Sequence, residues 1–163
     1  MVQPLRTVAV LIANPALSSI LSMTLAGVPS LRVRPFESEL ALRSYLRLAP
    51  ADLVVADFDS AVSPAHEVAE SLRADATIPK QLQIIALASA LSIETKAASI
   101  HAGIDEIIMK PMSPRYLVER VVARLAKSTA APAVVRRGLH KRDWSKFGDN
   151  VVPLFRPAPQ PQA

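Results

Sequence analysis

Residues 101–127 read HAGIDEIIMKPMSPRYLVERVVARLAK, and this stretch decides the fold. A short apolar run at 106–109 is typical of a buried strand, and the Lys110-Pro111 pair that follows predicts a turn. Ser113 and Pro114 then open an amphipathic pattern that predicts a helix over 113–127. One strand and one helix, joined by a tight turn, therefore form the last unit of the chain's globular part.

Four similar units precede it. Apolar or alternating runs predict strands at 7–12, 31–35, 53–56 and 83–88, and each is followed by a helical pattern. Asn14, Ser38 and Ser92 stand at helix starts, and Gly27 and Gly103 at helix ends. Five strand–helix units favour a doubly wound α/β fold, a five-stranded parallel sheet with helices on both faces. An all-helical chain is the alternative, but the β-branched runs before each cap argue against it.

Composition excludes several classes of protein. The chain has 163 residues and no cysteine, which excludes disulfide scaffolds and cysteine-ligated metal centres. Its three histidines are scattered, so a histidine-rich metal site is not expected. The apolar stretches fall short of the roughly 20 residues of a membrane span, and the N-terminus lacks a signal-peptide pattern. These features predict a cytoplasmic protein that does not engage a membrane.

The C-terminal segment differs from the rest. Residues 1–127 are nearly neutral, whereas 128–163 are basic and contain five prolines. We therefore expect a globular domain at 1–127 and a disordered, basic, Pro-rich tail at 128–163. Four large apolar side chains in this tail are candidate partner-binding anchors: Trp144, Phe147, Leu154 and Phe155. Nucleic-acid binding by the tail is a weaker alternative, because no recognisable DNA-binding module follows the globular part.

Candidate functional residues follow neighbouring strands. Asp57 comes after the third strand, Ser89 after the fourth and Lys110 after the fifth. The carboxyl ends of parallel strands meet at one edge, so these residues are expected to converge. A carboxylate beside an ammonium can act as a nucleophile toward a phosphoryl group, whose oxygens the ammonium stabilises. The arginines of the last helix, Arg120 and Arg124 among them, are most simply its solvated face.

Over about residues 5–127 the chain resembles the receiver domain of two-component response regulators. The resemblance lies in VAVLIANPAL, DLVVADFDSAV, IIALASA, HAGIDEIIMKP and KPMSPRYLVERV. It implies that Asp57 is the phosphoacceptor position, that Lys110 is the phosphoryl-contacting lysine, and that the Lys110-Pro111 bond is cis. In this family the last helix, together with the fourth helix and fifth strand, is the usual docking or dimer surface.

The chain also departs from the family pattern. The two acidic residues that hold Mg²⁺ in the family are replaced by Ile12 and Ala13, and the aromatic switch residue by Ile107. The family's hydroxyl residue falls on Ala88, which leaves Ser89 next to it as a substitute phosphoryl contact. Asp59 could join Asp57 as a weak metal ligand, so no cofactor is expected beyond weakly bound Mg²⁺.

These departures predict a degenerate, single-domain response-regulator-like protein of two-component or phosphorelay signalling. It is expected to carry no catalytic residues and to act through protein contacts with a histidine kinase or a downstream signalling protein. A homodimer is a further candidate arrangement. The alternative is a working switch that a histidine kinase phosphorylates on Asp57.

Overall fold

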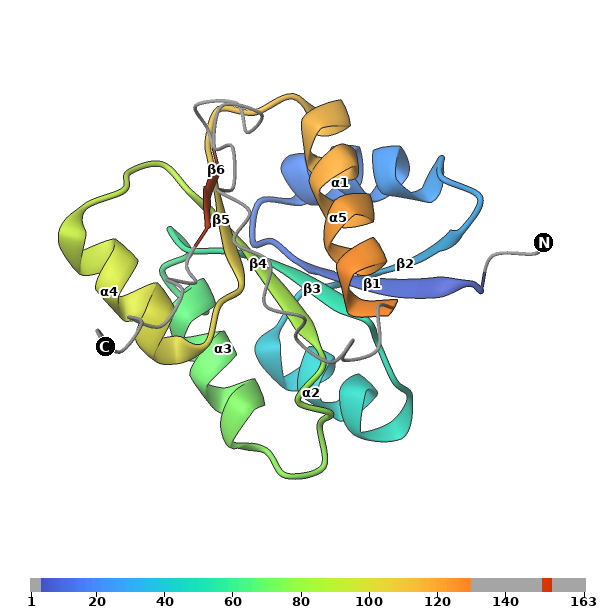
Figure 1. Ribbon diagram of the computed structural model, residues 1–163, viewed down its shortest axis with the longest axis horizontal. Helices are drawn as coiled ribbons and strands as arrows, with labels where there is room; N and C mark the ends of the chain where they lie inside the picture. The colour runs from blue at the N-terminus through green and yellow to red at the C-terminus, as the bar shows by residue number, and fades with distance from the viewer. Residues whose placement is uncertain (1–3, 130–150, 154–163) are drawn as a thin grey trace, which may run out of the picture.

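The computed structural model describes residues 4–129 and 151–153 (Figure 1). Strands and helices alternate along the chain: β1 (Arg6–Leu11), α1 (Pro15–Ala26), β2 (Leu31–Phe36), α2 (Glu39–Leu48), β3 (Leu53–Asp57), α3 (Ala65–Ala74), β4 (Gln83–Ala88), α4 (Ile93–Ala102), β5 (Glu106–Met109), α5 (Pro114–Thr129) and β6 (Val151–Pro153). The sheet has the order β2-β1-β3-β4-β5-β6. The first five strands are parallel, which confirms the predicted fold class.

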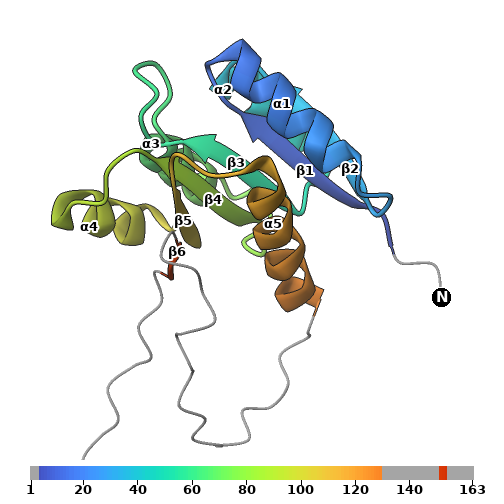
Figure 2. The same ribbon diagram turned by 90° about the horizontal axis from the view of Figure 1, so that it is seen from above.

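Helices cover both faces of this sheet (Figure 2). Because side chains alternate along a strand, Val54 and Ala56 of β3 face one core, and Leu53 and Val55 face the other. Helices α2, α3 and α4 contribute to the first core, and α1 and α5 to the second. The central strands are therefore buried on both sides, which explains their nearly unbroken apolar sequence.

The helices begin and end where their capping residues stand. Asn14 Oδ1 accepts the N–H groups of Ala16 and Leu17 at 3.0 and 3.1 Å, and so starts α1. Ser38 and Ser92 cap α2 and α4 in the same way. Gly103 ends α4 with φ of +80°, in the left-handed region that favours glycine. These boundaries confirm the signals read from the sequence.

Several boundaries and one element differ from the expectation. Strand β1 begins and ends one residue earlier than expected, and β2 and β3 each end one residue later. Helix α5 continues to Thr129, past the expected end at 127. The expectation of a disordered tail is wrong for three residues, because Val151–Pro153 form strand β6, which pairs antiparallel with β5. β-branched valines favour extended backbone, and β5 would otherwise be an open edge. The four candidate anchors Trp144, Phe147, Leu154 and Phe155 lie outside the described residues.

Among the described residues, no helix combines the length and the apolar character needed to cross a membrane. At the opposite edge from β6, β2 is the outermost strand and carries Pro35, a residue that an edge strand tolerates.

The buried face of α5 should carry much of the fold's stability. Leu117 is fully buried, whereas Leu48 at the end of α2 is 89% exposed. We expect Leu117→Ala to lower the free energy of unfolding by about 3 kcal/mol, because a cavity replaces a packed side chain. Leu48→Ala, the matched control, should change it by less than about 0.5 kcal/mol. Urea denaturation measures both; equal effects would contradict this packing.

Candidate functional site

Three loops meet at the carboxyl edge of the sheet, as the sequence predicted. Asp57 is the last residue of β3 and is 9% exposed. Lys110 directly follows β5, and its N–H donates to the carbonyl oxygen of Ala88 at 2.8 Å. The Lys110-Pro111 peptide bond is cis, as the family resemblance implied. The last residues of β3, β4 and β5 thus bring Asp57, Ala88 and Lys110 together.

The ammonium of Lys110 lies between two carboxylates. Its Nζ is 2.9 Å from Asp57 Oδ1 and 2.9 Å from Asp59 Oδ2. The side chain of Asp57 is largely buried, whereas that of Asp59 is 38% exposed. One positive charge therefore neutralises part of two negative charges at the rim of the sheet.

Backbone groups fix both carboxylates in this arrangement. Asp57 Oδ1 accepts the N–H of Asp59 at 2.9 Å, which closes a tight turn after β3. Phe58 N–H donates to Leu87 O at 2.7 Å, so the turn is tied to β4. Asp59 Oδ2 accepts the N–H of Ser89 at 2.8 Å. Ser89, which the sequence predicts as a phosphoryl contact, donates its backbone N–H to Asp59 in this structure.

Proton affinities at the site reflect these contacts. Burial alone would lower the pKa of Lys110, but its hydrogen bonds to Asp57 and Asp59 and their negative charges raise it above the usual lysine value. Burial alone would raise the pKa of Asp59, but the hydrogen bonds from Lys110 and Ser89 lower it below the usual aspartate value. The charged forms of Lys110 and Asp59 are thereby favoured together.

The first strand brings no charge to this edge. Leu11 lies beside Ala56 in the β1–β3 register, so Ile12 follows beside Asp57. Ile12 is buried in the core, and Ala13 is exposed. Ile107, at the family's switch position, is fully buried. In the part of the chain that the structure describes, no group of three or more acidic, histidine or cysteine side chains is arranged to hold a metal ion.

A second charged cluster was missed by sequence reasoning. Arg120 binds Glu106 through two contacts, Nε to Oε1 at 2.6 Å and Nη2 to Oε2 at 3.1 Å. Arg124 Nη2 lies 3.7 Å from Asp105 Oδ1, and Arg73 Nη2 donates to Asp105 Oδ2 at 3.0 Å. The expectation that Arg120 and Arg124 form a solvated face is therefore wrong. Both are largely buried because buried carboxylates at the start of β5 need partners.

This cluster helps hold β5 against its neighbours. Asp105 Oδ2 also accepts the N–H of Ile84, a residue of β4, at 2.7 Å. Burial raises the pKa of Asp105, although the Ile84 N–H, Arg73 and Arg124 act in the opposite direction. Helical periodicity alone could not reveal this cluster, because the acidic partners of these arginines lie outside the helix, at the start of β5.

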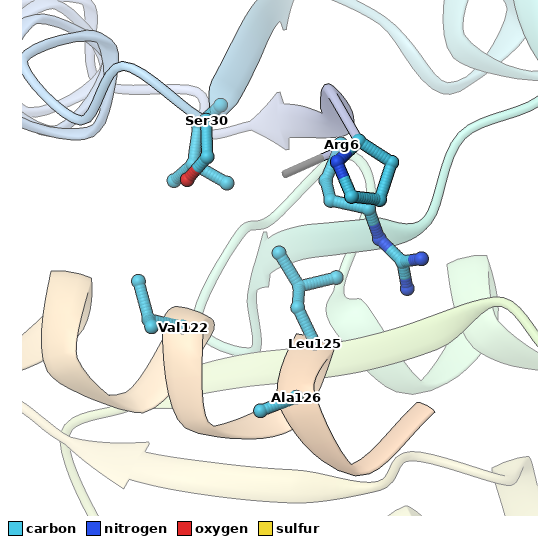
Figure 3. Close-up of a pocket in the computed structure, with 7 residues that line it drawn as sticks. Arg6, Ser30, Val122, Leu125 and Ala126 are labelled. Atoms are coloured by element: carbon cyan, nitrogen blue, oxygen red, sulfur yellow. The ribbon is translucent and has the colours of Figure 1, made fainter. Parts of the chain in front are cut away.

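An apolar pocket of about 410 Å³ lies away from the Asp57 site (Figure 3). Arg6 at the start of β1 and Leu31 at the start of β2 line it together with Val122 and Leu125 of α5. It therefore lies at the amino ends of β1 and β2, whereas Asp57 and Lys110 lie at the carboxyl edge of the sheet.

Removing the ammonium of Lys110 should show how strongly it lowers the pKa of Asp59. We expect Lys110→Met to raise the pKa of the Asp59 carboxyl, because the variant lacks the main ion-pair partner. In the wild type, the stabilisation from this contact is present above the unfolded-state pKa of about 3.9 and is lost as pH falls through the lowered folded-state pKa. Carboxyl-carbon NMR titration measures the shift.

Lys96→Met is the matched control, because Lys96 lies on the exposed part of α4. It should leave the Asp59 titration unchanged. An unaltered Asp59 pKa in Lys110→Met would contradict the contact.

No protein-family model matches the chain. A DNA-binding response regulator, MtrA of Mycolicibacterium smegmatis, is 30% identical over 120 residues, which cover 74% of this chain and 50% of the relative. The chain thus spans about half the length of that curated relative.

Solved structures share the fold. A response regulator receiver domain protein (CheY-like) from Methanospirillum hungatei is 19% identical, with a TM-score of 0.67 over 76% of this chain and 96% of that one. A putative response regulator from Chloroflexus aurantiacus is 23% identical, with a TM-score of 0.66 over 75% and 98%. The fold and the sequence similarity to response regulators agree, and the globular part of this chain is a receiver domain similar to those of response regulators.

Proposed function

We propose that this protein serves two-component or phosphorelay signalling through protein contacts, and that phosphorylation of Asp57 is weak or absent. The observation that carries the proposal is the position of Lys110, whose ammonium contacts Asp57 and Asp59 at the same time. The proposed partners are a histidine kinase or a downstream signalling protein, and the proposed location is the cytoplasm. In this account the protein has no enzymatic activity of its own.

Phosphoryl transfer to Asp57 would need charge neutralisation that this site supplies poorly. The Asp57 carboxylate would attack phosphorus, the leaving group would depart with the bonding electrons, and negative charge on the phosphoryl oxygens would require cations. A divalent ion contributes several kcal/mol of such stabilisation in comparable reactions. Lys110 is the cation that contacts Asp57 directly here.

The available oxygen ligands do not suit Mg²⁺. Ile12 and Ala13 have no side-chain oxygen, so β1 supplies no carboxylate beside Asp57. The two carboxylates that remain, Asp57 and Asp59, each have an oxygen on the Lys110 ammonium. A divalent cation between them would meet the positive charge of Lys110 at close range. The residues present therefore do not fit the metal that the family resemblance implies.

Asp59 already holds the two donors that a phosphoryl group on Asp57 would require. Its Oδ2 accepts from the Ser89 N–H and contacts the Lys110 ammonium. A new phosphoryl group would have to displace this carboxylate and would then face its negative charge. The carboxylate of Asp59 thus acts as an internal anion that occupies the place of the phosphoryl group. The side chains of the site therefore keep the same arrangement when no phosphoryl group is present.

A working phosphoacceptor switch is the second candidate, because Asp57 and Lys110 keep a 2.9 Å contact. Incubation with acetyl phosphate and Mg²⁺, followed by intact mass spectrometry, separates the two candidates. We expect the wild type to keep its unmodified mass. Stoichiometric gain of one phosphoryl group, lost in Asp57→Ala, would refute the proposal in favour of the switch.

A designed variant tests the stated cause. Ala13→Asp combined with Asp59→Asn adds a carboxylate at an exposed position near Asp57 and removes the internal anion. Under the same conditions this variant should gain one phosphoryl group in a Mg²⁺-dependent manner, and Asp57→Ala should abolish the gain. Asp59→Asn alone is the control, since it removes the internal anion without adding a metal ligand.

Nucleic-acid binding through the tail remains the third candidate, and residues 130–150 lie outside the described part of the chain. It predicts strongly salt-dependent retention on DNA that is lost on deletion of residues 128–163.

A further inference from the structure

The two edges of the parallel sheet differ in how they are protected. The edge strand of a sheet presents unpaired N–H and C=O groups that can pair with another chain. At the β2 edge, Arg32, Arg34 and Pro35 are exposed, and such charges and a proline oppose pairing. Strand β5 has neither a proline nor a lysine, and Ile107 and Ile108 at its centre are apolar and fully buried.

Strand β6 covers the edge that β5 leaves unprotected. Val151 lies opposite Ile108, and Val152 lies opposite Ile107, in an antiparallel pair (Figure 1). The N–H of Lys110, directly after β5, donates to the carbonyl oxygen of Ala88 in β4. Because successive N–H groups of a strand point in opposite directions, those of Glu106 and Ile108 are directed toward β4, and that of Ile107 is directed toward β6. β6 therefore lies along the side of β5 to which the Ile107 N–H points.

The new outer edge is itself protected against further pairing. Pro153, opposite Glu106, has no N–H to donate and ends the strand. With β6 in place, each outermost strand of the sheet carries a proline, Pro35 in β2 and Pro153 in β6. The sheet thereby ends in strands that are poor templates at both edges.

The cover is short and joined to the domain by a long connection. Only three residues of β6 pair with β5, and residues 130–150 separate them from α5. Each backbone hydrogen bond of such a pair gives only a small net stabilisation, and closing a long connection opposes it. The pairing of β6 with β5 is therefore expected to open far more readily than the pairing between the parallel strands.

We propose that Val151–Pro153 is a displaceable cover of the β5 edge, and that β5 of a second copy of this chain is the partner that the cover excludes. Two uncovered β5 strands can pair antiparallel about a two-fold axis, because the same edge then meets itself. The two isoleucines at the centre of β5 favour such pairing, and the charge of Glu106 is bound by Arg120. The arginines and Pro35 of β2 oppose such pairing at the other edge. This inference rests on β5 and β6 and is independent of the state of Asp57.

Val152→Pro in the full-length chain tests the proposal. The substitution removes the N–H at the residue opposite Ile107, whose own N–H points toward β6, and so disfavours β6. We expect faster hydrogen exchange at the amide of Ile107 in dilute solution. We also expect dimerisation at a concentration at least about tenfold lower than for the wild type, because the tethered competitor is lost. Sedimentation velocity measures the second effect.

Val135→Pro is the matched control, a valine-to-proline change in the same tail but outside β6. This variant should show the same amide hydrogen exchange and the same sedimentation as the wild type. A peptide of residues 148–156, added to Val152→Pro, should reverse the dimerisation. Unchanged exchange at Ile107, or unchanged association, in Val152→Pro would overturn the proposal.

Discussion

The ammonium of Lys110, held between the carboxylates of Asp57 and Asp59, is the interaction on which the account of this receiver domain depends. Parallel strands deliver their ends to one edge, so the fold alone brings an acidic and a basic residue together there. The residues around them decide the chemistry. With apolar residues at the end of β1, the ammonium is the partner that the two acidic side chains share, and Asp59 takes the donors that a phosphoryl group would need.

The fifth strand connects this site with the rest of the molecule. Lys110 follows it directly, buried ion pairs fasten its start to α5 and α3, and β6 covers its outer edge. Buried ion pairs of this kind add little net stability, but they favour one packing arrangement over others. The position of Lys110 is therefore constrained from both ends of β5, and Ile107 is fixed in the core rather than free to move at the surface.

Much of the fold could be predicted from the sequence, because each strand and helix carries its own local signal. Asn14, Ser38, Ser92 and Gly103 mark helix ends by hydrogen bonding and backbone preference, which are properties of the neighbouring residues alone. The convergence of Asp57 and Lys110 followed from the topology. The ion pairs of Arg120 and Arg124 and the pairing of β6 with β5 could not be predicted, since they join segments far apart in the chain. The contacts of Asp59 with Lys110 and the Ser89 N–H could not be predicted either, because residue spacing does not show which groups a side chain will reach.

The most direct test is the affinity of the wild-type protein for Mg²⁺, measured by titration while the amide resonances of Asp57, Asp59 and Ser89 are followed by NMR. With the ammonium already between the two carboxylates, we predict no saturable shift of these resonances up to about 10 mM Mg²⁺. Saturable binding at millimolar or lower concentrations, lost in Asp57→Ala, would contradict the account and would make this domain a metal-dependent phosphoacceptor.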